Sequence, residues 1–484
     1  MSHCSSTLHS RLLQLQSRFT WDLTEEDLDL ENLSTRLQDH IDLQLGQRGA
    51  VALSYSFLAY VRYLQDRKEE AVALLNQSEE KTRECFTEDS ERRLIVTYGD
   101  LAWLKYQTGD YTQSQIYCKR VDDILAKYPT GSSTVLHPEV YGEKGWTYLK
   151  FRKSYYPKAI DCFRKALELQ PEDSEWNAGC AIALYRTEPR VQETLKEDEE
   201  SPAFKQLRRA LQINPDDGVL LSMLALKLVA YNKHQEAEGL VEKALKIEPD
   251  HPHVMRYVGK YLRIQGENEQ SIDLLKRALE RSKKSAFIHH QLAMCYKKKK
   301  TDEQTKKPFD KQNKEAKLWR YMCMKHLDEA VKIKSGFVLA IADLALLYGE
   351  EKNLSKAEEL FKLGSQKLLE TEKDICQVFH LRYAEFHHYH TKQEAEAIAH
   401  YTEGLKLTPK KWEWKQCAKK LKQIAERRLS LDENDDEAYG LLALVAKAEG
   451  NRKTAAEFYE KALNCVEKDE YLSALMELRM ELLG

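Results

Sequence analysis

Hydrophobic positions recur along most of the chain at intervals of three and four residues, the spacing of one face of an α-helix. Residues 58–75 and 98–121 each contain two such segments, separated by a short polar turn at 66–68 in the first and at Gly109 and Asp110 in the second. Pro and Gly are rare within these segments, so each predicts a helix, a turn and a second helix. The pattern therefore predicts an all-α fold built from helical hairpins.

The second helix of this unit recurs as RKALELQP, RRALQINP, EKALKIEP and KRALERS, with a small residue at a fixed place. The first two copies lie further apart in the sequence than the later ones. The extra residues coincide with an acidic insert, EPRVQETLKEDEESP, between Arg186 and Ala203. The small residues that mark successive units are Ala166, Ala210, Ala244, Ala278, Ala330, Gly364, Gly404 and Ala462.

A helical unit that repeats about every 34 residues is typical of tetratricopeptide repeats. The prediction is a superhelical solenoid of roughly eight or nine hairpins, in which each hairpin buries its apolar face against its neighbours. We divide it into N-terminal repeats (1–135), central repeats with the candidate pocket (136–285) and C-terminal repeats (286–484). Such arrays bind along the concave side, which the first helix of each hairpin lines.

Two residue pairs point to a binding pocket in the central repeats. Trp146 and Lys150 are four residues apart, and Ile182 and Arg186 have the same spacing on a later helix. Each pair places an aromatic or apolar group one helical turn from a permanent positive charge. If both helices face the same side, the four side chains form a pocket suited to a nucleotide that carries phosphates.

Composition limits the other possibilities. The formal net charge of −3 gives no whole-surface attraction for nucleic acid, so basic residues must act locally. Ten cysteines are scattered without a C-x-x-C pair, which is typical of reduced thiols in the cytoplasm. The chain shows no secretory signal, and its most apolar run, from Val219, contains Lys227 and predicts a buried helix, not a membrane span.

The sequence contains none of the catalytic motifs considered below, and we predict that the protein is not an enzyme. Phosphate-binding glycine loops and the G-x-S-x-G elbow are absent from the sequence, and the repeats leave no room for a catalytic domain. His387, His388 and His390 cluster without a Cys or carboxylate at metal-ligand spacing, so we predict structural or surface histidines and no metal site.

Three further stretches carry charge. An amphipathic helix through Leu33 and Leu37 places Arg36 and His40 on a different face, either simply solvated or available to a ligand. Residues 297–317 hold nine lysines and four acids, and we expect an exposed loop. Residues 410–428 hold eight basic residues with Trp412 and Trp414, which fits either a nucleic-acid channel or a solvated face packed through its tryptophans.

Several ordered motifs resemble one family. FTWDL at 19–23, EKGWTYLKF at 143–151, AGCAIALYR ending at Arg186, MRYVGKYLR at 255–263 and HHQLAMCYK at 289–297 resemble the interferon-induced proteins with tetratricopeptide repeats. The resemblance extends over essentially the whole chain. It implies a cytoplasmic antiviral protein that captures the 5′ end of foreign single-stranded RNA, with a triphosphate or a cap lacking ribose 2′-O-methylation, in a central channel and inhibits its translation.

The resemblance also implies residue roles. Lys150 and Arg186, with Tyr156 close by, would hold the 5′ phosphates, and Arg36 and His40 would reach the bridging phosphates. Trp146 would stack on a cap base, with Leu149 and Ile182 lining that pocket. His40 stands where the family usually has glutamine, and Val219 and His253 replace tyrosines. The residues implied to contact the first nucleotides are Arg256, Tyr257, Lys260, Arg263, Phe287, His290 and Gln291.

The chemistry of these residues agrees with that reading. Arg offers a bidentate fork and Lys a point charge to phosphate oxygens, and aromatic rings stack on any base. We predict no cofactor and leave open a divalent cation beside the phosphates. Partners would be RNA and possible copies of itself or related proteins, with no membrane and no DNA. The alternative is a protein–protein scaffold or co-chaperone adaptor that reads an acidic peptide tail.

Overall fold

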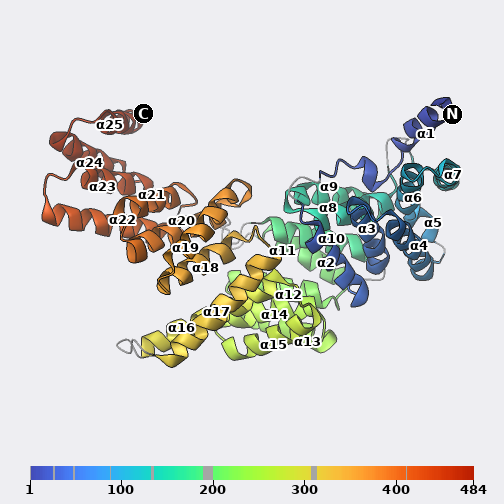
Figure 1. Ribbon diagram of the computed structural model, residues 1–484, viewed down its shortest axis with the longest axis horizontal. Helices are drawn as coiled ribbons and strands as arrows, with labels where there is room; N and C mark the ends of the chain where they lie inside the picture. The colour runs from blue at the N-terminus through green and yellow to red at the C-terminus, as the bar shows by residue number, and fades with distance from the viewer. Residues whose placement is uncertain are drawn as a thin grey trace. The chain divides into compact units, whose positions relative to one another are not determined.

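The computed structural model describes residues 2–483 except 25–27, 47–48, 88, 132–135, 189–199, 307–312 and 410 (Figure 1). Within these residues the chain is helical and contains no strand, as the periodicity predicts. It forms two compact units, Met1–Ile288 and His289–Gly484. The three-part division of the sequence stays a prediction.

The first unit consists of short helices that pair into consecutive hairpins. They are α1 (Ser2–Leu12), α2 (Leu30–Asp42), α3 (Ala50–Leu64), α4 (Lys68–Cys85), α5 (Ser90–Arg93), α6 (Ile95–Gln107), α7 (Tyr111–Lys127), α8 (Pro138–Phe151), α9 (Tyr156–Leu169), α10 (Ser174–Thr187), α11 (Pro202–Ile213), α12 (Gly218–Ala230), α13 (His234–Ile247), α14 (Pro252–Gln265) and α15 (Asn268–Arg281).

The second unit continues the same architecture. Its helices are α16 (Ala286–Lys306, which begins just before the boundary), α17 (Lys314–Ile333), α18 (Val338–Glu350), α19 (Leu354–Gln366), α20 (Lys373–Phe386), α21 (Glu394–Lys406), α22 (Trp412–Leu431), α23 (Asp436–Ala448), α24 (Arg452–Cys465) and α25 (Asp469–Leu483). Within the described residues, no helix is both long and apolar enough to cross a membrane.

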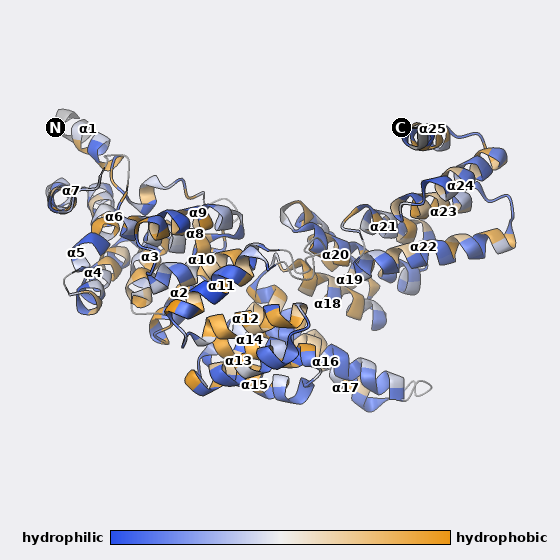
Figure 2. Cartoon of the chain, turned by 180° about the vertical axis from the view of Figure 1, so that it is seen from behind, coloured by the Kyte–Doolittle hydropathy of each residue, from blue (hydrophilic) through white to orange (hydrophobic). Residues whose placement is uncertain are grey.

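The marked small residues lie where paired helices cross. Ala166 and Ala244 are fully buried in α9 and α13. At Gly364 an added Cβ would overlap the ring of Phe379, so no larger side chain fits between the helices there. α12, which contains the apolar run from Val219, is largely buried, and hydrophobic colours predominate in this helix in Figure 2. The predicted repeat and the buried helix are therefore confirmed.

A buried ion-pair network fixes the N-terminal segment to the repeats. Arg18 is 1% exposed and donates to Asp100 Oδ2 at 2.6 Å and to Glu143 Oε1 at 2.7 Å. The same guanidinium donates to Ser56 Oγ at 3.0 Å. Because these partners lie on α6, α8 and α3, one side chain joins the segment that precedes α2 to three helices.

The lysine-rich stretch is not the loop that its composition predicts. Residues 297–306 lie in α16 and residues 314–317 in α17, while 307–312 lie outside the described residues. Ion pairs neutralise two lysines of this helix: Lys297 donates to Asp343 at 2.6 Å and Lys300 to Glu350 at 2.8 Å. Most of the acidic insert, 189–199, also lies outside the described residues.

The two tryptophans of residues 410–428 have different environments. Trp414 is 7% exposed and donates its indole N–H to Leu405 O at 2.9 Å, whereas Trp412 is 56% exposed. Several basic residues of α22 are paired, among them Lys422 with Glu449 and Arg428 with Asp435. Packing through Trp414 is thus observed, and a nucleic-acid role for this helix stays untested.

Candidate nucleic-acid interface

Four cationic side chains of the first unit all act electrostatically on His40, although they come from four helices. Arg36 lies on α2, Lys150 on α8, Arg186 on α10 and Arg256 on α14. Burial, together with the charges of Arg186 and Arg256, lowers the pKa of Arg36 to about 10. Helices from separate repeats therefore bring these charges together, as the sequence predicts for Lys150 and Arg186.

The Arg36 side chain is reached by solvent and is also surrounded by protein atoms. Its side chain keeps exposed surface, yet desolvation is the largest cause of its lowered pKa. Its guanidinium donates to Lys150 O at 3.4 Å, which ties α2 to α8. A charge that water reaches while protein surrounds it can exchange that water for an anion. Arg36 and His40 consequently do not lie on a merely solvated face.

Lys150 carries the strongest sign of a site built for an anion. Burial, together with the charges of Arg36, Arg18 and Arg186, lowers the pKa of its ammonium to about 8, against the opposing effect of Glu175. Its Nζ donates to Ser54 Oγ at 3.2 Å. A cation destabilised by burial and by other cations gains most when a polyphosphate supplies the missing negative charge.

Arg186 is held by tyrosine hydroxyls. It donates to Tyr156 and Tyr257, and these contacts raise its pKa despite burial. Burial would raise the pKa of Tyr257, but Arg256 and Arg186 lower it to about 8. The hydroxyl groups of Tyr156 and Tyr257 orient the guanidinium, and its charge stays available to a ligand.

Trp146 lies beside these cations. Its ring is half-buried, packs edge-on against Phe163, and has Lys150 Nζ 5.7 Å from its centroid. Its indole nitrogen is buried and has no hydrogen-bond partner among the described residues. Ile182 is partly buried against the same core, whereas Leu149 is 2% exposed inside it. Leu149 therefore supports the pocket from within the core.

A row of aromatic rings continues from this region within the first unit. Tyr257 lies 6.3 Å from Tyr185 and 5.9 Å from Phe287, measured between ring centroids. The Arg256 guanidinium lies 4.8 Å from the Tyr257 ring and 5.6 Å from the Phe287 ring. Lys260 and Arg263 are half-buried further along α14. A guanidinium beside two aromatic rings suits backbone phosphates and stacked bases.

The remaining two predicted contacts belong to the second unit. His290 packs against Phe337 at 4.8 Å, and Gln291 is 5% exposed. The structure thus gathers the predicted phosphate and cap residues within the first unit, while these two residues are described only in their own unit.

Two residues near the site, Glu175 and Tyr185, carry no clear signal in the sequence. Glu175 is buried, and its pKa is raised to about 7 by burial, against the opposing effect of Arg93. Glu175 lies in the first turn of α10, where carboxylates are common because they interact favourably with the helix dipole. Its position in the sequence therefore gave no sign of a role in the site. Tyr185 precedes Arg186 directly, and that adjacency was the available signal for it.

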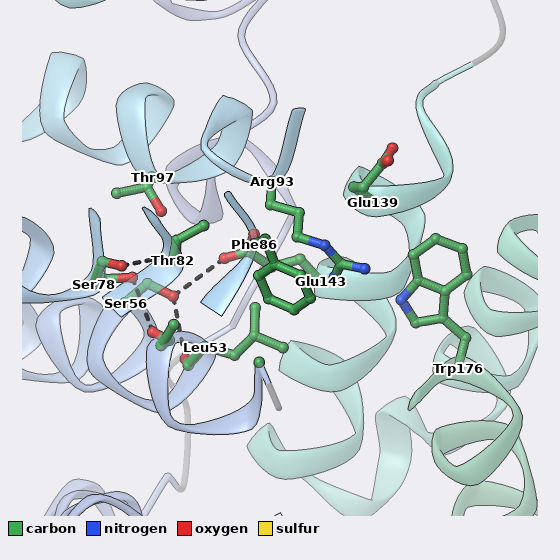
Figure 3. Close-up of a pocket in the computed structure, with 12 residues that line it drawn as sticks. Leu53, Ser56, Ser78, Thr82, Phe86, Arg93, Thr97, Glu139, Glu143 and Trp176 are labelled. Atoms are coloured by element: carbon green, nitrogen blue, oxygen red, sulfur yellow. Dashed lines mark hydrogen bonds between the residues drawn. The ribbon is translucent and has the colours of Figure 1, made fainter. Parts of the chain in front are cut away.

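A separate cavity of about 20 Å³ lies in the first unit (Figure 3). Ser56, Glu143, Arg93 and Trp176 are among its lining residues, and the Arg93 guanidinium stacks 3.9 Å from the centroid of the Phe86 ring. Such a volume holds about one water molecule. The twelve described residues that line it include none of those predicted to bind RNA, so it is not the candidate site.

The described residues contain no group of three or more His, Cys, Asp or Glu side chains placed to hold a metal ion. A divalent cation beside bound phosphates would also draw ligands from the RNA, and that possibility stays a prediction.

Comparison with known proteins identifies the fold. Tetratricopeptide repeat models match residues 138–173, 222–286 and 436–464. The human antiviral innate immune response effector IFIT1 is 34% identical over 464 residues, covering 93% of this chain and 94% of that protein. A monomeric mutant of IFIT1 solved with Gppp-AAAA superimposes with a TM-score of 0.86 at 31% identity, over 95% of this chain and 99% of that one.

The human IFIT1 dimer solved with PPP-AAAA also matches, with a TM-score of 0.80 at 31% identity over 95% of this chain and 100% of that chain. Similarity at this level, over nearly the full length of both chains, shows common descent and not merely a shared repeat. The chain belongs to the family of interferon-induced proteins with tetratricopeptide repeats.

Proposed function

We propose that this protein binds the 5′ end of foreign single-stranded RNA, with a triphosphate or a cap, and withholds that end from translation as part of the antiviral response. The observation that carries the proposal is the convergence of Arg36, Lys150, Arg186 and Arg256, all from different helices. Solved structures of the related IFIT1 hold Gppp-AAAA and PPP-AAAA, which supports an RNA end as the ligand.

The roles of the residues follow from their geometry. Lys150 and Arg186 would hold the phosphates, with Tyr156 and Tyr257 orienting the guanidinium. Trp146 would stack on a cap base, because its ring is half-buried beside Lys150. Arg256, Phe287 and their neighbours would contact the first nucleotides. Binding alone is sufficient for this function, which acts by steric capture in the cytoplasm without catalysis.

Self-association is part of the proposal. The related human IFIT1 was solved as a dimer with PPP-AAAA. We propose that this chain also pairs with itself or with related family members, and that RNA is its principal ligand.

The test is a competition gel shift at fixed salt, because nonspecific attraction to RNA depends on salt. Four RNAs of the same short sequence are compared, and they carry a 5′-triphosphate, a cap, a 2′-O-methylated cap or a 5′-hydroxyl. We expect discrimination among these ends. Equal binding to all four would sink the proposal and favour the protein–protein scaffold, which predicts peptide binding insensitive to RNase.

Variants locate the site. Lys150→Ala or Arg186→Ala should weaken binding to 5′-triphosphate RNA about tenfold or more, because each removes an enclosed charge from the phosphate contact. Binding to 5′-hydroxyl RNA should change little. Lys205→Ala, which removes an exposed lysine from α11, is the matched control. Equal losses on both RNAs would remove Lys150 and Arg186 from the phosphate-binding role.

A further inference from the structure

Two histidines from distant parts of the sequence meet beside the cationic cluster. The ring of His40, on α2, lies 5.3 Å from that of His253, on α14, in an edge-on arrangement. His253 also lies 5.4 Å from His251. His251 has a local structural role, since its Nδ1 accepts the backbone N–H of His253 at the start of α14. His40 and His253 require another explanation.

The surroundings of the pair are strongly cationic. Lys150 from α8, Arg36 from α2, Arg256 from α14 and Arg186 from α10 all act on His40. His253 faces Arg256, His40, His251 and Arg186. Among the described groups that act most strongly on the two rings there is no carboxylate. The buried Nδ1 of His40 has no hydrogen-bond partner among the described residues.

In this environment both imidazoles are neutral at pH 7. Burial lowers the pKa of each well below 6.5, and the neighbouring cations lower it further. An anion placed among the same cations reverses the local field and favours the protonated ring. A protonated imidazole donates from both nitrogens, whereas the neutral ring donates from one.

We propose that His253 joins His40 in contact with the 5′ polyphosphate, and that the pair takes up one proton when the RNA end binds. The proton comes from the solvent and resides on an imidazole nitrogen in the complex. This inference rests on the proposed function, because it requires the phosphates to occupy the cluster. It adds His253 to the binding residues and makes affinity depend on pH.

The test uses RNA that begins with an unmethylated Gppp cap, since its bridging phosphates have no proton that titrates near neutral pH. Affinity is measured at fixed salt from pH 6 to 8, and calorimetry in two buffers of different ionisation enthalpy counts the protons taken up. For one linked proton, affinity should rise as pH falls, by up to about tenfold per pH unit.

Variants separate the histidines from other titrating groups. The double variant His40→Gln with His253→Gln should have a smaller pH slope and a smaller proton uptake, while Lys150 still titrates in both proteins. The single variant His40→Gln provides the same comparison if the double variant folds poorly. His251→Asn keeps a side chain that can begin α14, and should retain the wild-type slope.

Zero proton uptake by the wild-type protein, or equal slopes in wild type and double variant, would overturn the inference. If either result is found and the wild-type protein still prefers Gppp RNA over 5′-hydroxyl RNA, the proposed function stands without the histidine contact. If wild type shows no preference among RNA ends, the proposed function fails first and the histidine contact fails with it.

Discussion

The indole ring of Trp146 packs edge-on against the ring of Phe163, with centroids 5.4 Å apart. Phe163 is fully buried and fills the space beside Gly145 and Gly179, where an added Cβ would overlap its ring atoms. Two glycines thus allow one phenylalanine from α9 to lie between α8 and α10. Phe163 thereby sets the position of the ring that we propose stacks on a cap.

Phe163→Leu should weaken binding to capped RNA about fivefold while leaving binding to triphosphate RNA within about twofold, because aromatic contacts contribute roughly 1 kcal/mol beyond their buried area. Dissociation constants for the two RNAs test this directly. The matched control is Phe204→Leu, a change at another buried phenylalanine, on α11. Equal weakening for both RNAs would show that Phe163 supports the fold rather than the position of Trp146.

Affinity for triphosphate RNA should fall as pH rises from 7 to 9. The Lys150 ammonium has its pKa lowered to about 8, so the free protein loses this proton across that range, whereas bound phosphates would retain it. The loss should approach about tenfold per pH unit above 8 for one linked proton.

Lys150→Arg should flatten this dependence, because arginine stays charged. Tyr257→Phe is a needed control, since Tyr257, with its pKa lowered to about 8, ionises in the same range and would add a negative charge beside Arg186. A wild-type affinity that is constant from pH 7 to 9 would contradict the assignment of Lys150 to the phosphates.

Arg18→Met should destabilise the first unit by about 3–5 kcal/mol, because it leaves the buried carboxylates of Asp100 and Glu143 without their cation. Urea unfolding followed by circular dichroism measures the change. Lys81→Ala removes one partner of an exposed pair with Glu84 and should leave the midpoint almost unchanged. A small effect at Arg18 would mean that water or rearrangement compensates the two carboxylates.

Much of the fold could be predicted from the sequence because helical repeats are encoded locally. Small buried residues such as Ala166 and Ala244 mark helix crossings. Their regular spacing in the sequence shows where successive hairpins lie along the chain. The candidate pocket was predictable for a similar reason: Trp146 and Lys150, like Ile182 and Arg186, need only one helix each to share a face.

Contacts between distant segments could not be predicted in this way. Arg18 meets Glu143 across 125 positions, and His40 meets His253 across a longer interval still. Neither pair leaves a periodic signal, since each depends on how the solenoid curves. The charge composition of residues 297–317 predicted an exposed loop with solvated lysines. Lys297 and Lys300 instead form ion pairs with Asp343 and Glu350 on α18, which are distant in the sequence.

Trp412→Ala and Trp414→Ala should separate the two roles that the sequence left open for α22. Trp414→Ala should destabilise the protein by about 3–5 kcal/mol, because it empties a buried site and leaves Leu405 O without its donor. Trp412→Ala should change stability by less than about 0.5 kcal/mol. Weaker binding of long RNA by Trp412→Ala, with unchanged stability, would favour a nucleic-acid role for this helix over simple solvation.

The hairpin of α20 and α21 should lose stability in mild acid. Its histidines lie close together: Nδ1 of His380 is 3.1 Å from Nδ1 of His400, and Tyr383 stacks on His400 with centroids 4.1 Å apart. Burial, together with His380 and His387, lowers the pKa of His400 to about 4. An unfolded histidine titrates at about 6.5.

Between these two values the unfolded state binds the proton and the folded state does not, so stability falls as pH falls from 6.5 toward 4. The loss at His400 should be roughly 1–3 kcal/mol. Hydrogen exchange followed by mass spectrometry can measure the opening of peptides from this hairpin at pH 7 and pH 5, after correction for the intrinsic exchange rate. His400→Gln should reduce the acid sensitivity, and His234→Gln, at an exposed histidine on α13, should not. Equal protection of the wild-type hairpin at both pH values would contradict the lowered pKa of His400.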